Sequence, residues 1–170
     1  MQASGEFEAF CRREYPRLVG ALSLHCGDPA VAEELAQEAL ARACDRWERV
    51  RVMRAPGAWV HRVAINLTNS HFRRRRAERR ASARHGDDAR NGQLDSDVAD
   101  AMAVRAAVAG LPAKQRTAIA LRFYLQYSVA ETAAVMDCSE DAVKQHTRRA
   151  VAALRGRFQP EQLRGEFRHG

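Results

Sequence analysis

The residues that could do chemistry in this chain do not gather into catalytic or metal-binding sets. Glu34 and Glu38 share a face at helical spacing, but no histidine beside them completes a metal-ligand set. The cysteines stand singly, at Cys11, Cys26, Cys44 and Cys138. With no CxxC pair they indicate reduced thiols, neither a zinc site nor a disulfide framework. No glycine-rich phosphate loop or nucleophile motif occurs. We therefore expect no enzyme, no cofactor, no metal and no small-molecule substrate.

Basic side chains are the stronger signal. The chain has 170 residues, with 28 Lys and Arg against 21 Asp and Glu, and a formal net charge of +7. Such an excess indicates a polyanionic partner where it is concentrated. One concentration is the run Arg73, Arg74, Arg75 and Arg76. These side chains cannot be buried together, and their planar guanidinium groups suit phosphate contacts. A merely solvated face is the alternative, but the helix leading into the run also carries Asn and Arg, which favours nucleic acid.

A second concentration lies in a predicted helix-turn-helix, residues 128–155. Ser128 and Glu131 form a capping pair that predicts a helix start, and the stretch 137–139 breaks the helical pattern. A second helix is predicted from near Glu140. Its buried line is Val143, Thr147, Ala150 and Leu154, and its exposed side is Lys144, Gln145, Arg148 and Arg149. Cations and amides on one side favour a DNA-reading helix, while an ordinary helical hairpin remains the alternative.

Three amphipathic helices are predicted to precede the arginine run, at about 6–25, 29–47 and 56–72. Asp28 is the expected N-cap of the second, with proline at its first position. The acidic outer side of that helix either docks a protein or simply suits a helix N-terminus. The third helix is expected to expose His61, Arg62, Asn66 and Asn69.

Apolar periodicity stops between 81 and 97, where Gly, Asp and Ser predominate, and this predicts a flexible linker. Beyond it, helices are predicted at 98–109 and 111–124, followed by the helix-turn-helix. The sequence therefore predicts an all-α protein of two small helical domains, 1–80 and 98–160, with a tail at 161–170. No signal peptide or membrane span is indicated, so we expect a cytoplasmic protein.

Three stretches in order resemble a bacterial RNA polymerase sigma factor of the extracytoplasmic-function (ECF) group, close to its SigE family. They are AEELAQEALARACDRW, WVHRVAINLTNSHFRRRR and LPAKQRTAIALRFYLQYSVAETAAVMDCSEDAVKQHTRRAVAALR. They are similar to the region 2 helix that docks on the polymerase, to the promoter-melting and −10 recognition helix, and to the region 4 domain that reads the −35 element. In region 4 this chain departs from the usual pattern at Asp141 and at Gln145-His146.

The resemblance implies core RNA polymerase and promoter DNA as partners, and in many family members an anti-sigma factor as well. The polymerase contact would involve Glu34, Leu35, Gln37 and Glu38. The −10 element and strand opening would involve Arg51, Arg54, Trp59, Arg62 and Asn66, with the run Arg73, Arg74, Arg75 and Arg76. The −35 element would be read by Lys144, Gln145, Arg148 and Arg149. The alternative function is a stand-alone helix-turn-helix transcriptional regulator, which would need neither the acidic helix nor the melting helix.

Overall fold

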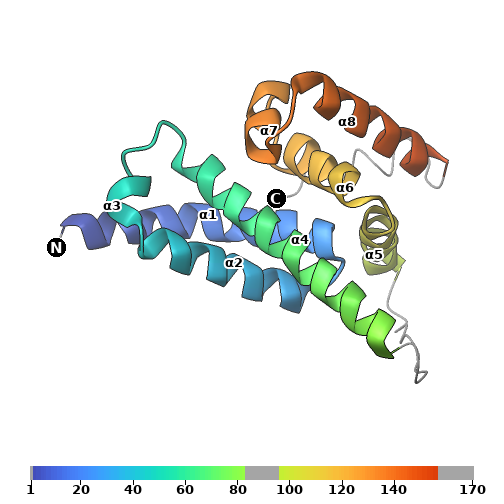
Figure 1. Ribbon diagram of the computed structural model, residues 1–170, viewed down its shortest axis with the longest axis horizontal. Helices are drawn as coiled ribbons and strands as arrows, with labels where there is room; N and C mark the ends of the chain where they lie inside the picture. The colour runs from blue at the N-terminus through green and yellow to red at the C-terminus, as the bar shows by residue number, and fades with distance from the viewer. Residues whose placement is uncertain (1, 83–95, 157–170) are drawn as a thin grey trace.

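The computed structural model describes residues 2–82 and 96–156, and every regular element in these ranges is helical (Figure 1). The N-terminal half, residues 2–82, contains α1 (Gln2–Cys26), α2 (Pro29–Cys44), α3 (Trp47–Val50) and α4 (Pro56–Ser82). The C-terminal half, residues 96–156, contains α5 (Ser96–Ala109), α6 (Ala113–Ile119), the π-helical turn η1 (Ala120–Tyr124), α7 (Val129–Met136) and α8 (Glu140–Arg155). The all-α prediction and its two helical regions are confirmed.

The N-terminal half has a core formed by α1, α2 and α4. Its fully buried side chains include Leu18, Leu22, Ala36, Val60 and Ala64. The predicted cap of α2 is present, since Asp28 Oδ1 accepts a hydrogen bond from the Ala30 amide at 3.0 Å. Small alanines along α2 let α1 and α4 pack closely against it.

The C-terminal half has its own core between α5, α6 and α8, lined by Val104, Val108, Ile119, Ala150 and Leu154. The capping box of α7 is complete: the Glu131 amide donates to Ser128 Oγ at 3.1 Å, and the Ser128 amide donates to Glu131 Oε2 at 2.7 Å. Ser139 caps α8 by a single hydrogen bond, its Oγ accepting from the Ala142 amide at 3.2 Å. The predicted helix-turn-helix is confirmed.

Several predicted boundaries differ from the structure. The helix predicted to end near Phe72 continues as α4 through the arginine run to Ser82, because arginine is a good helix former. The helix predicted to reach Trp47 ends at Cys44, and α3 follows as a separate turn. Residues 83–95, which are most of the predicted linker, and 157–170, which include the predicted tail, lie outside the described residues. The domain boundaries therefore stay a prediction.

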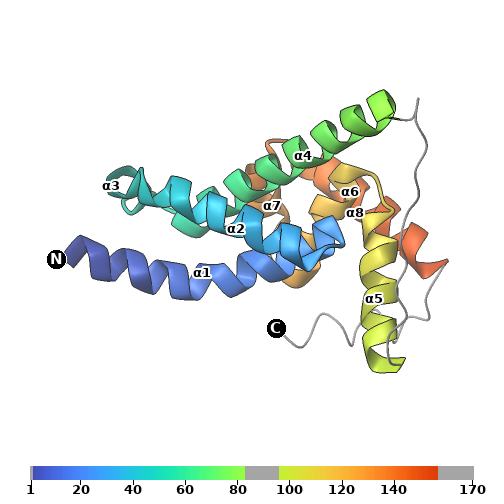
Figure 2. The same cartoon turned by 90° about the horizontal axis from the view of Figure 1, so that it is seen from below.

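The two halves are in contact. η1 packs against α1 and α7 packs against α4. Figures 1 and 2 show α5 crossing near the end of α1. The π-helical turn η1 is stabilised by wider hydrogen bonds, among them Leu125 N to Ala120 O at 3.0 Å. Such turns interrupt regular helices and are frequent at functional sites.

Candidate nucleic-acid interface

The loop between α3 and α4, residues 51–55, is fully at the surface. Val52 is 71% exposed and Met53 39%, and the predicted DNA residues Arg51 and Arg54 are exposed beside them. Arg51 forms an ion pair with Glu48, with Nη2 and Oε2 2.7 Å apart. Apolar side chains between cations form a surface that can meet both an unstacked base and the phosphates beside it.

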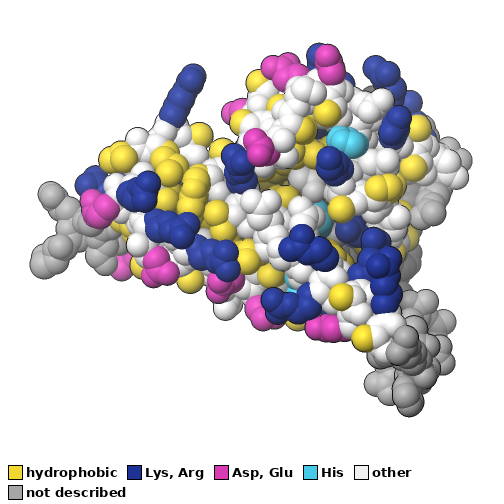
Figure 3. All heavy atoms as spheres, viewed as in Figure 1, with side chains coloured by type: hydrophobic (Ala, Val, Ile, Leu, Met, Phe, Trp, Pro, Cys, Tyr) yellow, Lys and Arg dark blue, Asp and Glu magenta, His cyan; other side chains and the backbone are white. Residues whose placement is uncertain are grey.

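Helix α4 carries most of the predicted −10 residues, and Arg62, Asn66 and the run 73–76 are exposed, as is Asn69. Arg62, Asn66, Arg73 and Arg76 share one side of the helix at its 3.6-residue period, whereas Arg74 and Arg75 point in other directions. Figure 3 shows Lys and Arg side chains gathering over the second part of α4. Trp59 differs, because it is half-buried and packs against the core of the N-terminal half, so that only part of its ring is available.

The prediction that His61 is exposed is wrong. Its side chain is 1% exposed, because Tyr127 of the C-terminal half covers it and the Tyr127 hydroxyl lies 2.5 Å from His61 Nδ1. Burial, with the nearby charge of Arg17, lowers the pKa of His61 to about 3, so the ring is neutral at neutral pH. Glu14 Oε2 lies 3.5 Å from its other nitrogen, but that carboxylate is already paired with Arg13 and Arg17.

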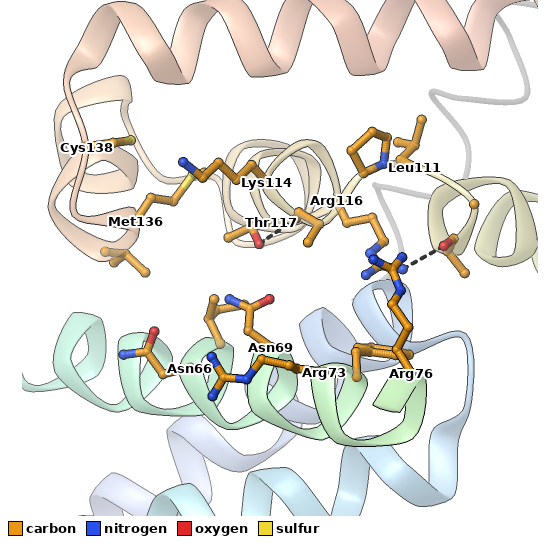
Figure 4. Close-up of a pocket in the computed structure, with 17 residues that line it drawn as sticks. Asn66, Asn69, Arg73, Arg76, Leu111, Lys114, Arg116, Thr117, Met136 and Cys138 are labelled. Atoms are coloured by element: carbon orange, nitrogen blue, oxygen red, sulfur yellow. Dashed lines mark hydrogen bonds between the residues drawn. The ribbon is translucent and has the colours of Figure 1, made fainter. Parts of the chain in front are cut away.

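Between α4 and the C-terminal half lies a cleft of about 780 Å³ (Figure 4). Asn66, Asn69 and Arg73 line it from α4, and Lys114 and Arg116 line it from α6. Among the described residues around it there is no acidic side chain. The cleft is therefore cationic on both walls. Part of the predicted −10 surface faces the other half of the chain rather than open solvent.

The arginines at the far end of this cleft lie close together. Arg76 points toward Arg116 (Figure 4), and burial together with the charge of Arg76 lowers the pKa of Arg116. The Arg116 guanidinium lies 4.8 Å from the centre of the Phe72 ring and donates from Nη1 to the Ala109 carbonyl at 2.7 Å. Those contacts hold the guanidinium in place despite the like charge.

The predicted −35 residues on α8 have a different setting. Lys144, Gln145, Arg148 and Arg149 are all exposed. Of the opposite line, Val143, Ala150 and Leu154 are buried, whereas Thr147 is half-buried and its hydroxyl has no hydrogen-bond partner. Lys144 pairs with Asp141 within the helix, Nζ to Oδ1 at 3.2 Å. The side of α8 that would enter a major groove is thus fully presented to solvent.

The predicted polymerase-binding residues lie on α2. Glu34, Gln37 and Glu38 are exposed, and Glu38 forms an ion pair with Arg42 at 2.8 Å. Leu35 is only 8% exposed and belongs to the core of the N-terminal half. Leu35 therefore lies on the buried side of α2, opposite the exposed acidic side chains.

Sequence reasoning missed a group of polar residues that join the two halves. His25 is completely buried, and its Nε2 lies 3.0 Å from Thr117 Oγ1. Arg62 Nη2 lies 3.2 Å from Asp137 Oδ2, in the turn of the helix-turn-helix. No local pattern indicates these pairs, because the partners are far apart in the chain and their contacts depend on how the halves pack.

The described residues contain no group of three or more His, Cys, Asp or Glu side chains placed to hold a metal ion. Within the same ranges no helix is long and apolar enough to cross a membrane.

Known proteins match both halves. The family model for Sigma-70 region 2 matches residues 10–78, and the model for Sigma-70, region 4 matches residues 101–154. An RNA polymerase sigma-E factor from Streptomyces antibioticus is 34% identical over 93% of this chain and 87% of its own length. The ECF RNA polymerase sigma factor SigM of Mycobacterium tuberculosis is 28% identical over 87% of this chain and 74% of its own. Among solved structures, the sigma factor RpoE in complex with the anti-sigma factor NepR, from Bartonella quintana, has a TM-score of 0.74 at 24% identity, covering 89% of this chain and 95% of that one.

Proposed function

Since this chain belongs to the extracytoplasmic-function group of the sigma-70 family of RNA polymerase sigma factors, we propose that it directs core polymerase in the cytoplasm to promoters with −10 and −35 elements and helps to open them. It does so as a binding protein that carries out no catalysis of its own. The single observation that carries the division of labour is the presence of two separate cation-and-amide faces, one on α4 and one on α8.

The α4 face and the loop 51–55 serve the −10 element. Flipping a base out of a duplex costs a few kcal/mol, which a pocket for the unstacked base can offset. The exposed Val52 and Met53 offer apolar contact to such a base, and Arg51 and Arg54 can hold its phosphates. Arg73 to Arg76 extend the cationic track for the released strand.

The α8 face serves the −35 element by lying in the major groove. Arginine and glutamine can make bidentate contacts to base edges, and lysine can contact phosphates. Each face alone binds modestly, but both are on one chain, and both are carried by one polymerase. Effective concentration then makes the second contact far more favourable than a separate binding event.

The acidic side of α2 serves the polymerase, through Glu34, Gln37 and Glu38 with Leu35 beneath them. A match to region 2 over residues 10–78 supports this role, and a stand-alone helix-turn-helix regulator would not need that half of the chain. An anti-sigma factor is a further proposed partner, supported by the likeness to RpoE, which was solved in complex with one.

Run-off transcription tests the proposal. Core polymerase alone and core polymerase with the full chain are given genomic fragments, and start sites are mapped. We expect new start sites that share two upstream elements. Binding of the chain to DNA without any chain-dependent start site would contradict the proposal and would favour the stand-alone regulator.

A further inference from the structure

The cleft between α4 and the C-terminal half gathers positive charge for which the chain supplies no counterpart. Arg73 and Arg76 line it from α4, and Lys114 and Arg116 line it from α6. No acidic side chain is among the described residues that line it, and the ion pairs within residues 2–82 and 96–156 involve other side chains. Like charges around one hollow repel each other, so an anion bound there would stabilise them.

Arg116 has hydrogen-bond donors that its neighbours leave unused. Its Nη1 donates to the Ala109 carbonyl at 2.7 Å, and its guanidinium lies 4.8 Å from the centre of the Phe72 ring. Its Nε is buried and has no hydrogen-bond partner among the described residues. A buried donor without an acceptor is unfavourable, and the planar guanidinium suits the paired oxygens of a phosphate. The surroundings of Arg116 therefore suit an oxyanion.

The opposite end of the cleft has a different character. Figure 4 shows Asn66 and Met136 toward the end that lies away from Arg116. Asn66 is exposed, so its amide can both donate to and accept from a polar ring edge, whereas Met136 is half-buried and presents a thioether. Thioethers pack favourably against aromatic rings, and asparagine amides pair with the edges of bases. This end therefore suits a flat heterocyclic ring.

The size of the cleft favours a small ligand. Its volume of about 780 Å³ lies within the range of roughly 300–1,000 Å³ that is usual for small-molecule sites. A single inorganic phosphate would leave the end at Asn66 empty, and a nucleoside alone would leave the arginines without a counter-charge. A free nucleotide carries both parts in one molecule, with a heterocycle at one end and several negative charges at the other.

We propose that this cleft is a binding site for a nucleoside di- or triphosphate, with the phosphates held by Arg76 and Arg116 and the base beside Asn66 and Met136. Lys114 adds to the positive charge of the wall that α6 supplies. Because the binding residues come from both halves of the chain, a bound nucleotide stabilises the folded chain in proportion to its occupancy. The site is independent of the proposed role of α4 at the −10 element, since it takes a free nucleotide rather than DNA.

The test measures binding of three probes to the full chain by isothermal titration calorimetry. The probes are ATP, tripolyphosphate and adenosine, which separate the contribution of the phosphates from that of the base. The buffer contains about 0.15 M salt, where attraction between exposed charges is screened beyond about 8 Å. A photoreactive ATP analogue with an azide on the adenine ring then labels the residues beside the base, and mass spectrometry identifies them.

Two double variants locate the phosphates. Arg76→Ala with Lys114→Ala removes one exposed cation from each wall of the cleft, and exposed substitutions of this kind cost little stability. Its control is Arg80→Ala with Arg155→Ala, which makes the same charge change at two exposed arginines, one in each half, that do not line the cleft. Thermal unfolding without ligand checks that both variants fold.

We expect one ATP to bind per chain, tripolyphosphate to bind several-fold more weakly and adenosine more weakly still. The cleft variant should lose roughly tenfold or more in ATP affinity, because it loses two charged contacts, while the control variant should match the unmodified chain. The azide label should map to α4 near Asn66 and to the end of α7 near Met136.

Three results would overturn the proposal. Absence of ATP binding would remove the site, and an equal loss of affinity in the two double variants would mean that ATP is attracted only by the overall charge of the chain. Tripolyphosphate that binds as tightly as ATP, or an azide label outside the cleft, would overturn the assignment of a nucleoside to the end at Asn66.

Discussion

Helices α4 and α8 present similar side chains, arginine with asparagine on one and arginine with glutamine on the other, but they have different surroundings. α4 packs on α1 and α2 and also on α7 of the other half, whereas α8 packs mainly on α5, α6 and α7 of its own half. As a result Arg62 of α4 is ion-paired across the interface, while Arg148 and Arg149 of α8 face solvent. The polar pattern of a helix thus shows which side avoids its own core, and the packing of distant elements decides whether that side is reachable.

The acidic surface of α2 provides the largest expected effect, because it acts before either DNA face. Glu34→Lys with Glu38→Lys reverses two exposed charges at the proposed polymerase contact. Like-charge contacts cost several kcal/mol, so affinity for core polymerase should fall roughly a hundredfold or more. Binding of the free chain to DNA should not weaken.

A matched control for that variant is Glu6→Lys with Glu8→Lys, which makes the same charge change at two exposed glutamates of α1. Co-purification and fluorescence anisotropy with core polymerase measure both. Equal polymerase affinity of the two double variants would remove α2 from the contact.

The second prediction concerns α8, the proposed −35 helix. Arg148→Ala with Arg149→Ala should leave the fold intact, because both side chains are exposed and the buried line of α8 is untouched. Each lost phosphate contact should flatten the slope of log affinity against log salt by ~0.9, and a lost bidentate base contact should cost roughly 1–3 kcal/mol of discrimination at one base pair.

Polymerase assembly should persist in this variant, since the α2 surface is on the other half. Promoter binding across a salt series, with assembly measured on the same samples, gives both values. An unchanged slope with full affinity would mean that α8 does not read DNA.

The features that the sequence predicted well are local ones. Ser128 and its partner Glu131 are three residues apart, and Asp28 caps the helix that begins at the next residue, so short-range rules were sufficient for the helix-turn-helix and for α2. The set of exposed residues on α8 was also predicted, because the main contacts of that helix among the described residues are with its neighbours α5, α6 and α7 on its buried side.

The burial of His61 could not be predicted in the same way. Tyr127, which covers it, is 66 residues further along the chain, and the 3.6-residue periodicity of α4 places His61 on the side that looks free. Leu35 is a different case, because its apolar periodicity predicts a packed position and its side chain does lie in the core, while the polymerase contact that the resemblance implies for it stays a prediction. Contacts between the halves were therefore the part that required a structure.

The contact between the two halves should depend on pH, because it buries two histidines. Burial lowers the pKa values of His25 and His61 to about 3, from an ordinary value of 6.5. Above pH 6.5 both rings are neutral whether the halves are joined or apart. As the pH falls below 6.5, separated halves take up protons that the joined state does not, so the joined state loses stability progressively toward pH 3.

At pH 5.5 this linkage should favour the open form by up to about tenfold for each histidine that opening exposes to water. The groups facing these rings are Glu14, Arg17 and Tyr127 at His61, and Arg116 with Thr117 at His25. Small-angle scattering between pH 7.5 and 5.5 measures the radius of gyration, which rises as the halves separate. The variant His25→Asn with His61→Gln should have a flatter profile, and an equally steep one would assign the pH response to other groups.

The smallest expected effect separates the support of α8 from that of α4. Ser128→Ala removes the hydroxyl that accepts from the Glu131 amide and so breaks the capping box of α7, on which α8 rests. Loss of an N-cap typically costs ~1 kcal/mol. Thermal unfolding should show a lower midpoint. Because the main contacts of α8 within the described ranges are with other helices of the C-terminal half, its hydrogen exchange should accelerate, while exchange in the part of α4 packed on α1 and α2 should change little. Equal acceleration in both helices would mean that the halves unfold as one cooperative unit, and that the different surroundings of the two DNA faces do not extend to their stability.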